Sequence, residues 1–121
     1  MYREAHYHST THESLGIFRG KARLRFGASI DDNPSDGIEL DVKVGDVIVI
    51  PAGISHCSLT ESGGFSMVGS YPDGAEQWDT CYGGEEKEVA KHKEKIKGIK
   101  IPEKDPVGGS DGPLNEHWKP E

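Results

Sequence analysis

Apolar and polar residues alternate along much of this sequence before residue 72, and a period of two is typical of half-buried β-strands. In residues 21–26 apolar side chains alternate with basic ones, so Arg23 and Arg25 are expected to face outward. Residues 38–44 continue the alternation, with an aliphatic residue at every second position. Residues 47–50 are an unbroken aliphatic run, which predicts a strand covered on both faces.

Glycines placed within longer alternating stretches predict two β-hairpins. One would turn at Gly20 within residues 13–26, and the other at residues 61–64 within residues 56–71. With a further strand at residues 2–8, the chain has about seven short strands, the pattern of a jelly roll or small barrel. The sequence therefore predicts an all-β fold.

The pattern changes in the last third of the chain. Residues 85–97 are rich in glutamate and lysine, with apolar positions at helical spacing, and Gly98 is placed to end a helix. One short amphipathic helix lying on the barrel is expected here, followed by an irregular tail rich in proline and glycine. We expect a barrel core of residues 1–74 and a C-terminal segment of residues 75–121 packed on it, together forming a single domain.

Composition narrows the classes of partner. The chain has 121 residues and a formal net charge of −7, which argues against nucleic acid and anionic membranes as partners. No apolar run approaches the length of a membrane span. The charged residues after Met1 do not resemble a secretory signal, so a reducing, cytoplasmic setting is expected and a Cys57–Cys81 disulfide is not.

Three histidines and a glutamate stand at positions that suit a metal site. His6 and His8 are two residues apart, so on an extended strand they point to the same face. Glu13 opens the next alternating run, and His56 follows a Pro-x-Gly turn at the end of an aliphatic strand. Because imidazole and carboxylate together suit first-row divalent metals, the sequence predicts a metal site inside a small β-barrel.

These residues also carry a resemblance to a known family. The first motif is His-x-His, four residues, Glu, six residues, Gly, and the second is Gly, five residues, Pro-x-Gly, two residues, His. The fixed positions are His6, His8, Glu13 and Gly20, then Gly45, Pro51, Gly53 and His56. The pair resembles the two motifs of the cupin superfamily, whose fold is the RmlC-like jelly roll, or double-stranded β-helix.

A narrower likeness extends over most of the chain. It rests on the segments at residues 6–13, 51–56, 67–72, 78–79 and 105–114. These look like the YjlB-like type of small bacterial and fungal cupins, a subgroup that brings no established substrate. Two features depart from the superfamily pattern: the glycine six residues before the first histidine is absent, and Thr60 stands where asparagine is common. We therefore expect a barrel that is open-edged or completed by a neighbouring subunit.

The resemblance implies a divalent metal (Fe, Mn, Ni or Zn) held by His6, His8, Glu13 and His56. The leading hypothesis is a metal-dependent enzyme acting on a small organic molecule, of the oxygenase or isomerase type, with Glu13 as a ligand or a base. The alternative is a non-catalytic barrel that binds or senses a small ligand. Cupin-like barrels commonly pair through an edge sheet, so a homodimer is expected.

The other histidines and the two cysteines are expected to have structural or solvent-exposed roles. His12 is expected to be a solvated turn residue facing away from the site, or a substitute ligand if the strand bulges there. Cys57 is expected to be a small buried side chain. Cys81 lies in a loop where it could be reactive, although packing is the favoured role. His92 on the charged helix and His117 in the tail are expected to be solvated.

Strand parity limits the walls of the site. Leu15 and Ile17 should share a face with Glu13, whereas either face of residues 65–71 could point to the metal. In both cases the lining is expected to be mainly apolar, with few polar anchors.

Overall fold

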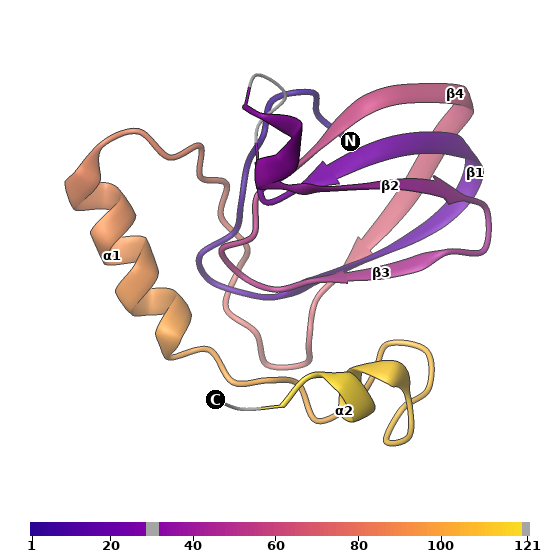
Figure 1. The fold of residues 1–121 in the computed structure, drawn as a ribbon. Helices are drawn as coiled ribbons and strands as arrows, with labels where there is room; N and C mark the ends of the chain where they lie inside the picture. Colours follow the sequence, from indigo (N-terminus) through magenta and orange to yellow (C-terminus); the bar gives the residue numbers. More distant parts are fainter. Residues whose placement is uncertain (29–31, 120–121) are drawn as a thin grey trace.

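The structure is a computed structural model that describes residues 1–28 and 32–119. Its sheet is antiparallel throughout, with two helices in the C-terminal part of the chain (Figure 1). The elements are β1 (Glu13–Phe26), a 3-10 helix (Pro34–Asp36), β2 (Ile38–Lys43), β3 (Val47–Ile50), β4 (His56–Ser70), α1 (Glu86–Lys97) and α2 (Pro113–His117). The all-β prediction is confirmed, and the tail contains a second short helix, α2.

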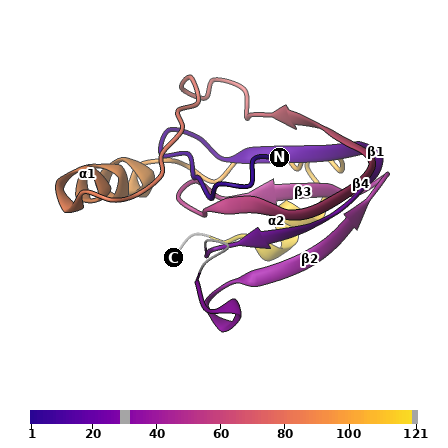
Figure 2. The ribbon, with the colours of Figure 1, turned by 90° about the horizontal axis from the view of Figure 1, so that it is seen from above.

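The sheet is built around β1, which pairs with every other strand. On one side, the first half of β1 pairs with β3 and the second half with β2. On the other side, β4 follows β1 along its whole length. Figure 1 shows both long strands bending sharply in the middle, and Figure 2 shows from above how the two halves of the sheet come to lie over one another. The sheet therefore folds over on itself.

Glycines make this bend possible. Gly20 in β1 has φ +70°, and Gly63 and Gly64 in β4 have φ +69° and +71°, a region that L-residues with side chains rarely adopt. The register shifts at the same point: Arg19 pairs with Ser66, but Lys21 pairs with Ser62. The extra residues of β4 form a bulge, which increases the local bend.

The two predicted hairpins are therefore wrong in their pairing. The glycines do turn the chain, but the two arms of residues 13–26 each pair with β4 rather than with one another. Local sequence marks where a strand bends, whereas the partner of each arm depends on residues far away in the chain. The expected strand at residues 2–8 is reduced to two isolated bridges, at His6 and Tyr7.

The core lies between the two halves of the folded sheet. Ile17 comes from the first half of β1, Ala22 and Leu24 from the second half, and Val42 from β2. Partly buried apolar side chains from the other strands pack against them, among them Ile48, Phe65 and Met67. The parity prediction for Leu15 and Ile17 is confirmed, because both are buried on the same face as Glu13. Residues 65 and 67 thus belong to the inward face of β4.

Two expectations about exposure are wrong. Arg25 is only 5% exposed, because its guanidinium lies against Glu39 at 2.9 Å and also donates to the Asp32 carbonyl oxygen. The outward face of β1 is thus covered at this point, whereas Arg23 remains open to solvent. The aliphatic run of β3 is not covered on both faces, since Val47 is 46% exposed at the start of an edge strand.

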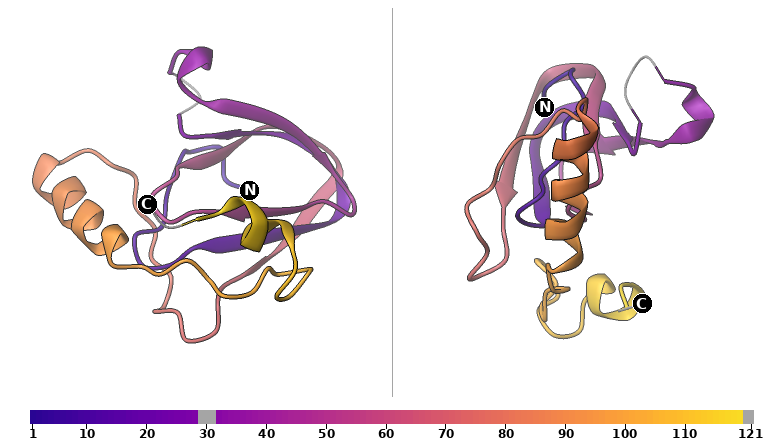
Figure 3. Two further views of the ribbon diagram at one scale, coloured as in Figure 1. Left: turned by 60° about the horizontal axis from the view of Figure 1, so that its bottom comes forward. Right: turned by 90° about the vertical axis from the view of Figure 1, so that its left-hand side faces the viewer.

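The C-terminal segment runs along one side of the sheet. Helix α1 begins and ends as predicted, with Gly98 as its C-cap, but none of its residues is buried. Figures 1 and 3 show α1 standing beside the sheet and α2 below it. Within the described residues, neither helix is long and apolar enough to span a membrane. A boundary near residue 74 stays a prediction.

Substituting Gly20 should test the bend. A Cβ atom at Gly20 would lie 2.4 Å from the Ser62 carbonyl oxygen and 2.7 Å from the Phe65 nitrogen. Gly20→Ala should therefore cost more than the roughly 1–2 kcal/mol of a left-handed alanine. Gly74→Ala is the matched control, because Gly74 has φ +79° but nothing within 4 Å of its Cβ position. Urea unfolding should show a clearly larger loss for Gly20→Ala, and equal losses would contradict the packing of the bend.

Candidate metal centre

The fold-over brings together side chains from the two ends of the β1–β4 ladder. Glu13 is the first residue of β1 and His56 the first of β4, but His56 pairs with Phe26 at the far end of β1. A straight strand would separate Glu13 from that point by about 43 Å. Instead, Glu13 Oε1 lies 3.7 Å from His56 Nε2. The bend is therefore what creates this site.

Backbone hydrogen bonds place the other two histidines beside His56. His6 and His56 exchange both backbone hydrogen bonds, at 3.2 and 2.9 Å, and so form a short antiparallel bridge. The carbonyl oxygen of His8 accepts from the Gly53 N–H at 2.8 Å. Gly53 has φ +87°, as the turn before His56 requires. The segment before β1 is thus held against the start of β4.

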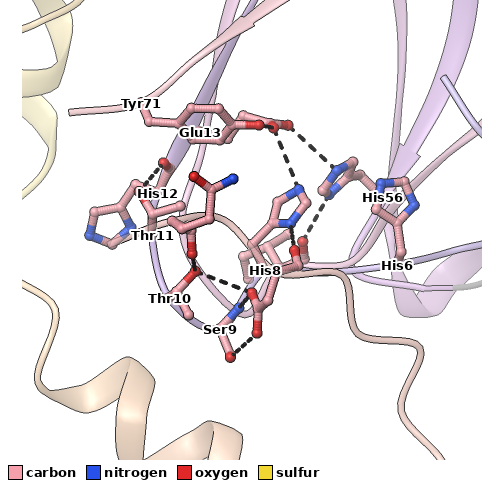
Figure 4. Close-up of polar contacts among 12 residues, drawn as sticks. His6, His8, Ser9, Thr10, Thr11, His12, Glu13, His56 and Tyr71 are labelled. Atoms are coloured by element: carbon pink, nitrogen blue, oxygen red, sulfur yellow. Dashed lines mark hydrogen bonds and ion pairs between the residues drawn. The ribbon is translucent and has the colours of Figure 1, made fainter. Parts of the chain in front are cut away.

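Three imidazoles and one carboxylate converge at this point (Figure 4). His6, His8 and His56 are all buried, and one ligand atom from each lies within 4.8 Å of the others. Glu13, also buried, has Oε2 3.5 Å from His8 Nε2 and Oε1 3.7 Å from His56 Nε2. The spacing prediction therefore identified four side chains that do come together.

The three imidazoles are oriented in the same way. Each Nδ1 is bonded to a backbone carbonyl oxygen, that of Glu4 for His6 (3.1 Å), Asp79 for His8 and Ile54 for His56 (3.1 Å). A carbonyl oxygen only accepts, so each Nδ1 carries the hydrogen and each Nε2 keeps its lone pair in the neutral ring. Metal-binding histidines typically have their second nitrogen held in this manner.

Burial and neighbouring charges set the protonation of the cluster. Burial, with the charges of His6 and His8, lowers the pKa of His56 to about 4, although its bond to Ile54 opposes the shift. Burial would raise the pKa of Glu13, but the nearby His8 ring and the hydrogen bond from Tyr71 outweigh it and lower the pKa. Glu13 is thus a carboxylate and His56 a neutral imidazole at pH 7, the forms that bind metals.

The donor set fits a divalent transition metal. When the metal–ligand bonds are about 2.1 Å long, neighbouring donor atoms lie about 3.0 Å apart in an octahedral site and about 3.4 Å apart in a tetrahedral one. Donor atoms on opposite sides of an octahedral ion lie about 4.2 Å apart. The separations of 3.5 and 3.7 Å from Glu13 lie within this range. The three histidine ligand atoms lie within 4.8 Å of one another, close enough to contact one ion. The cluster can therefore hold a metal, although nothing in the donor set selects a particular one.

An aromatic pair borders the carboxylate. Strand parity left Tyr71 on one of two possible walls of the site, whereas Trp78 was not recognised from the sequence as part of it. The Tyr71 hydroxyl donates to Glu13 Oε2 at 2.8 Å. Trp78 stacks on the Tyr71 ring, with a centroid distance of 6.4 Å and an interplanar angle of 13°, and its edge also meets the His8 ring. These contacts come from residues beyond the barrel strands. Sequence spacing gives no signal for Trp78.

A cleft of about 990 Å³ opens beside the cluster. Glu13 and Tyr71 line it, whereas none of the three clustered histidines does. The opposite wall is formed by residues 99–106 of the C-terminal segment. Apolar atoms make up the larger part of its surface, as expected, but threonine, serine and charged side chains add more than the few polar anchors expected. Glu13 connects the metal cluster to the open space.

His12 is neither solvated nor a ligand. It points away from the cluster, as predicted from strand parity (Figure 4), but it is only 6% exposed. Its Nδ1 accepts from the Ala52 N–H at 2.9 Å and its Nε2 donates to the Lys100 carbonyl oxygen at 3.1 Å. Both ring nitrogens are occupied, and Trp118 lies against the ring. His12 therefore joins the C-terminal segment to the barrel.

The remaining histidines and both cysteines differ in burial, and all but His92 have the burial expected from the sequence. Cys57 is fully buried and Cys81 is 7% exposed, and both are free thiols, as expected. His117 is exposed, as expected. His92 differs from its expectation, because it is half-buried and its Nδ1 is hydrogen-bonded to the Tyr7 hydroxyl at 2.8 Å.

Alanine substitutions should separate the two kinds of buried histidine. His12→Ala leaves the buried Ala52 N–H without its acceptor, which should cost about 1–3 kcal/mol of stability while metal affinity is retained. His8→Ala should lower metal affinity at least about tenfold, since even losing a residue that only orients a ligand costs this much. Thermal unfolding and calorimetric metal titration would measure the two effects. Loss of metal binding in His12→Ala with normal binding in His8→Ala would contradict this assignment.

Comparisons with known proteins agree with this geometry. The family model described as Cupin matches residues 2–69, which include all four converging side chains. The uncharacterized protein YjlB of Bacillus subtilis (strain 168) is 39% identical over 115 residues, covering 93% of this chain and 64% of that protein. This chain thus spans less than two thirds of the relative's length, and no solved structure matches it. The chain belongs to the cupin family, and its antiparallel sheet is consistent with the family's β-barrel.

Proposed function

We propose that this protein is a metal-dependent enzyme acting on a small organic molecule, of the oxygenase or isomerase type. The ligands would be His6, His8, Glu13 and His56. The observation that carries the proposal is the convergence of four nitrogen and oxygen donors beside a cleft large enough for a small molecule. Four protein ligands can leave positions open on an octahedral ion, as catalysis requires.

A divalent iron, manganese, nickel or zinc ion would polarise a carbonyl or enol of the substrate and, if redox-active, exchange electrons with dioxygen. The protein's own contribution is to orient the groups around that ion. Glu13 Oε2 accepts the Tyr71 hydroxyl, so Oε1 is the oxygen free to take a proton if Glu13 acts as a base. The stack of Trp78 on Tyr71 keeps this hydroxyl in place.

Burial of the cluster supports chemistry that excludes water. Glu13 is 7% exposed and His56 1% exposed, so charges near them are weakly screened. The cleft gives a substrate access from the side of Glu13 and Tyr71. We infer that the substrate enters between the start of β1 and residues 99–106, and meets Glu13 before the histidines.

A second candidate is a binding protein that holds a small ligand without turnover. One observation favours it: among the described residues, the only titratable group bonded to the candidate ligands from outside the cluster is Tyr71. Burial and the hydrogen bond to Glu13 raise the pKa of Tyr71, so its hydroxyl is a poor proton donor. In this case Glu13 would serve only as a metal ligand.

Both candidates are consistent with a cytoplasmic location, which we infer from the chemistry of the cysteines. Cys57 and Cys81 are free thiols. Free thiols persist in the reducing cytosol, whereas oxidising compartments favour disulfides.

Metabolite profiling should distinguish turnover from binding. Protein loaded separately with Fe(II), Mn(II), Ni(II) or Zn(II) would be incubated in air with a cell extract of small molecules, alongside His8→Ala and the exposed-histidine control His117→Ala. For an enzyme, mass spectrometry should show at least one compound depleted and a new one formed by the wild type and by His117→Ala, but not by His8→Ala.

A different result would identify the binding protein. Compounds that co-purify with the wild type, remain chemically unchanged and are lost from His8→Ala would contradict catalysis and support the second candidate. A failure of every divalent ion to bind the wild type above the level of His8→Ala would contradict both.

We also propose that the protein forms a homodimer through the edge strand β2. Ile38 and Leu40 are 64% and 45% exposed there, and in the described residues β2 pairs only with β1. An unpaired edge with exposed aliphatic side chains is a surface that a second strand can extend. Light scattering at micromolar concentration should give a dimer mass for the wild type and a monomer mass for the double variant Ile38→Lys, Leu40→Lys. Val68→Lys, at a similarly exposed valine of β4, should remain a dimer, and a monomeric wild type would contradict the proposal.

A further inference from the structure

A second cluster of potential metal ligands lies beside the histidine site but shares no side chain with it. It consists of Asp79, Cys81 and His92, whose ligand atoms all lie within 4.8 Å of one another. Asp79 and Cys81 come from the segment between β4 and α1, and His92 comes from α1 itself. Cys81 is buried, and the other two are half-buried. We propose that this cluster is a thiolate-containing site for a borderline-soft divalent metal of the Zn²⁺ class.

The separations within the cluster match a single tetrahedral ion. Cys81 Sγ lies 3.2 Å from an Asp79 carboxylate oxygen and 3.8 Å from His92 Nε2. A zinc ion with usual bond lengths places a sulfur and a neighbouring nitrogen or oxygen ligand about 3.5 Å apart. The two observed distances lie on either side of this value. The Asp79 and His92 ligand atoms also lie within 4.8 Å of each other, so one ion could contact all three atoms once the side chains close around it.

Neighbouring groups already orient two of the three ligands. The other nitrogen of His92, Nδ1, is hydrogen-bonded to the Tyr7 hydroxyl at 2.8 Å, which leaves Nε2 directed at Cys81. Asp79 Oδ1 accepts the Ser9 N–H at 2.8 Å and Oδ2 accepts the Ser9 hydroxyl at 2.5 Å. These bonds hold the carboxylate as an anion and fix its direction. Such outer-shell bonds are typical of protein metal sites.

The ligand types indicate the kind of metal. Thiolate and imidazole together favour zinc over magnesium or calcium, whereas the first cluster contains only nitrogen and oxygen donors. On binding, the Cys81 thiol releases its proton to solvent, and the sulfur lone pair forms the bond to the ion. Without metal, burial and Asp79 keep the thiol protonated, since they raise its pKa to about 11. Three protein ligands leave a fourth position for water.

Such a site would fasten α1 to the barrel. Helix α1 has no buried residue, so apolar packing holds it weakly. Its contacts with the rest of the protein include the bond from Tyr7 to His92 and the approach of Ile96 to Gly53. An ion on Asp79, Cys81 and His92 would add a strong link between α1 and the segment after β4. It would also fix Asp79, whose carbonyl oxygen holds the His8 ring.

Cobalt substitution tests the site directly. Protein stripped of metal with a chelator and titrated with Co²⁺ should develop a near-ultraviolet thiolate-to-cobalt charge-transfer band. Cys81→Ser should abolish this band, and Cys57→Ser, which changes the other buried cysteine, should keep it. His92→Asn should weaken cobalt binding at this site at least about tenfold, while His117→Asn should leave it unchanged.

The cobalt experiment tests the second cluster separately from the histidine site. His6→Asn and His56→Asn should keep the thiolate band even if they remove the other metal, so the two proposals can fail separately. Should Cys81→Ser fail to fold, alkylation of the wild type provides a second measurement: Zn²⁺ should protect Cys81 and leave the labelling of Cys57 unchanged. A cobalt-loaded wild type without a thiolate band, or a band that survives in folded Cys81→Ser, would overturn the proposal.

Discussion

The bend in β1 and β4 is the constraint on which the rest of this structure depends. These strands pair along their whole length, and Glu13 and His56 belong to opposite ends of that ladder. Only a sheet folded back on itself can bring the two ends within 4 Å. Gly20, Gly63 and Gly64 allow the fold because they adopt positive φ, and at Gly20 the strands approach too closely for a side chain. The glycine that ends the first motif thus takes part in positioning the candidate ligands.

The same bend makes the core and the metal site parts of one arrangement. Along the inward face of β1, Glu13 is followed by Leu15 and Ile17, so the carboxylate lies next to the apolar core. Packing on this face excludes water from the imidazoles and fixes the carboxylate position. The segment before β1 completes the site through its backbone exchange with His56. A disturbance of the core should therefore reach the site.

Sequence reasoning identified the four candidate ligands because their spacing follows local geometry. His6 and His8 share a face by simple parity, and the turn before His56 requires the glycine that the motif supplies. It failed where the answer depends on distant residues. The partner of each arm of β1, the burial of Arg25 by Glu39 and the two bonds of His12 all come from long-range contacts.

The C-terminal segment shows most clearly that local sequence patterns do not predict long-range contacts. Helix α1 was predicted from its periodicity and its glycine stop, but its attachment through His92 was not. Asp79 joins the two clusters, because its carboxylate is bonded to Ser9 and its carbonyl oxygen to His8. The segment that leads into this charged helix thus holds the ring of a candidate metal ligand, His8. No local pattern could indicate this, since the contact crosses 71 positions of the chain.

We expect the side chains of residues 6, 8, 13 and 56 to surround one ion. Anomalous X-ray scattering from crystals loaded with a divalent transition metal would test it most directly. An anomalous peak is expected about 2.0–2.2 Å from Nε2 of His6, His8 and His56 and from one oxygen of Glu13. Fully loaded crystals with no peak at this point, or with a peak that contacts fewer than three of these residues, would contradict it.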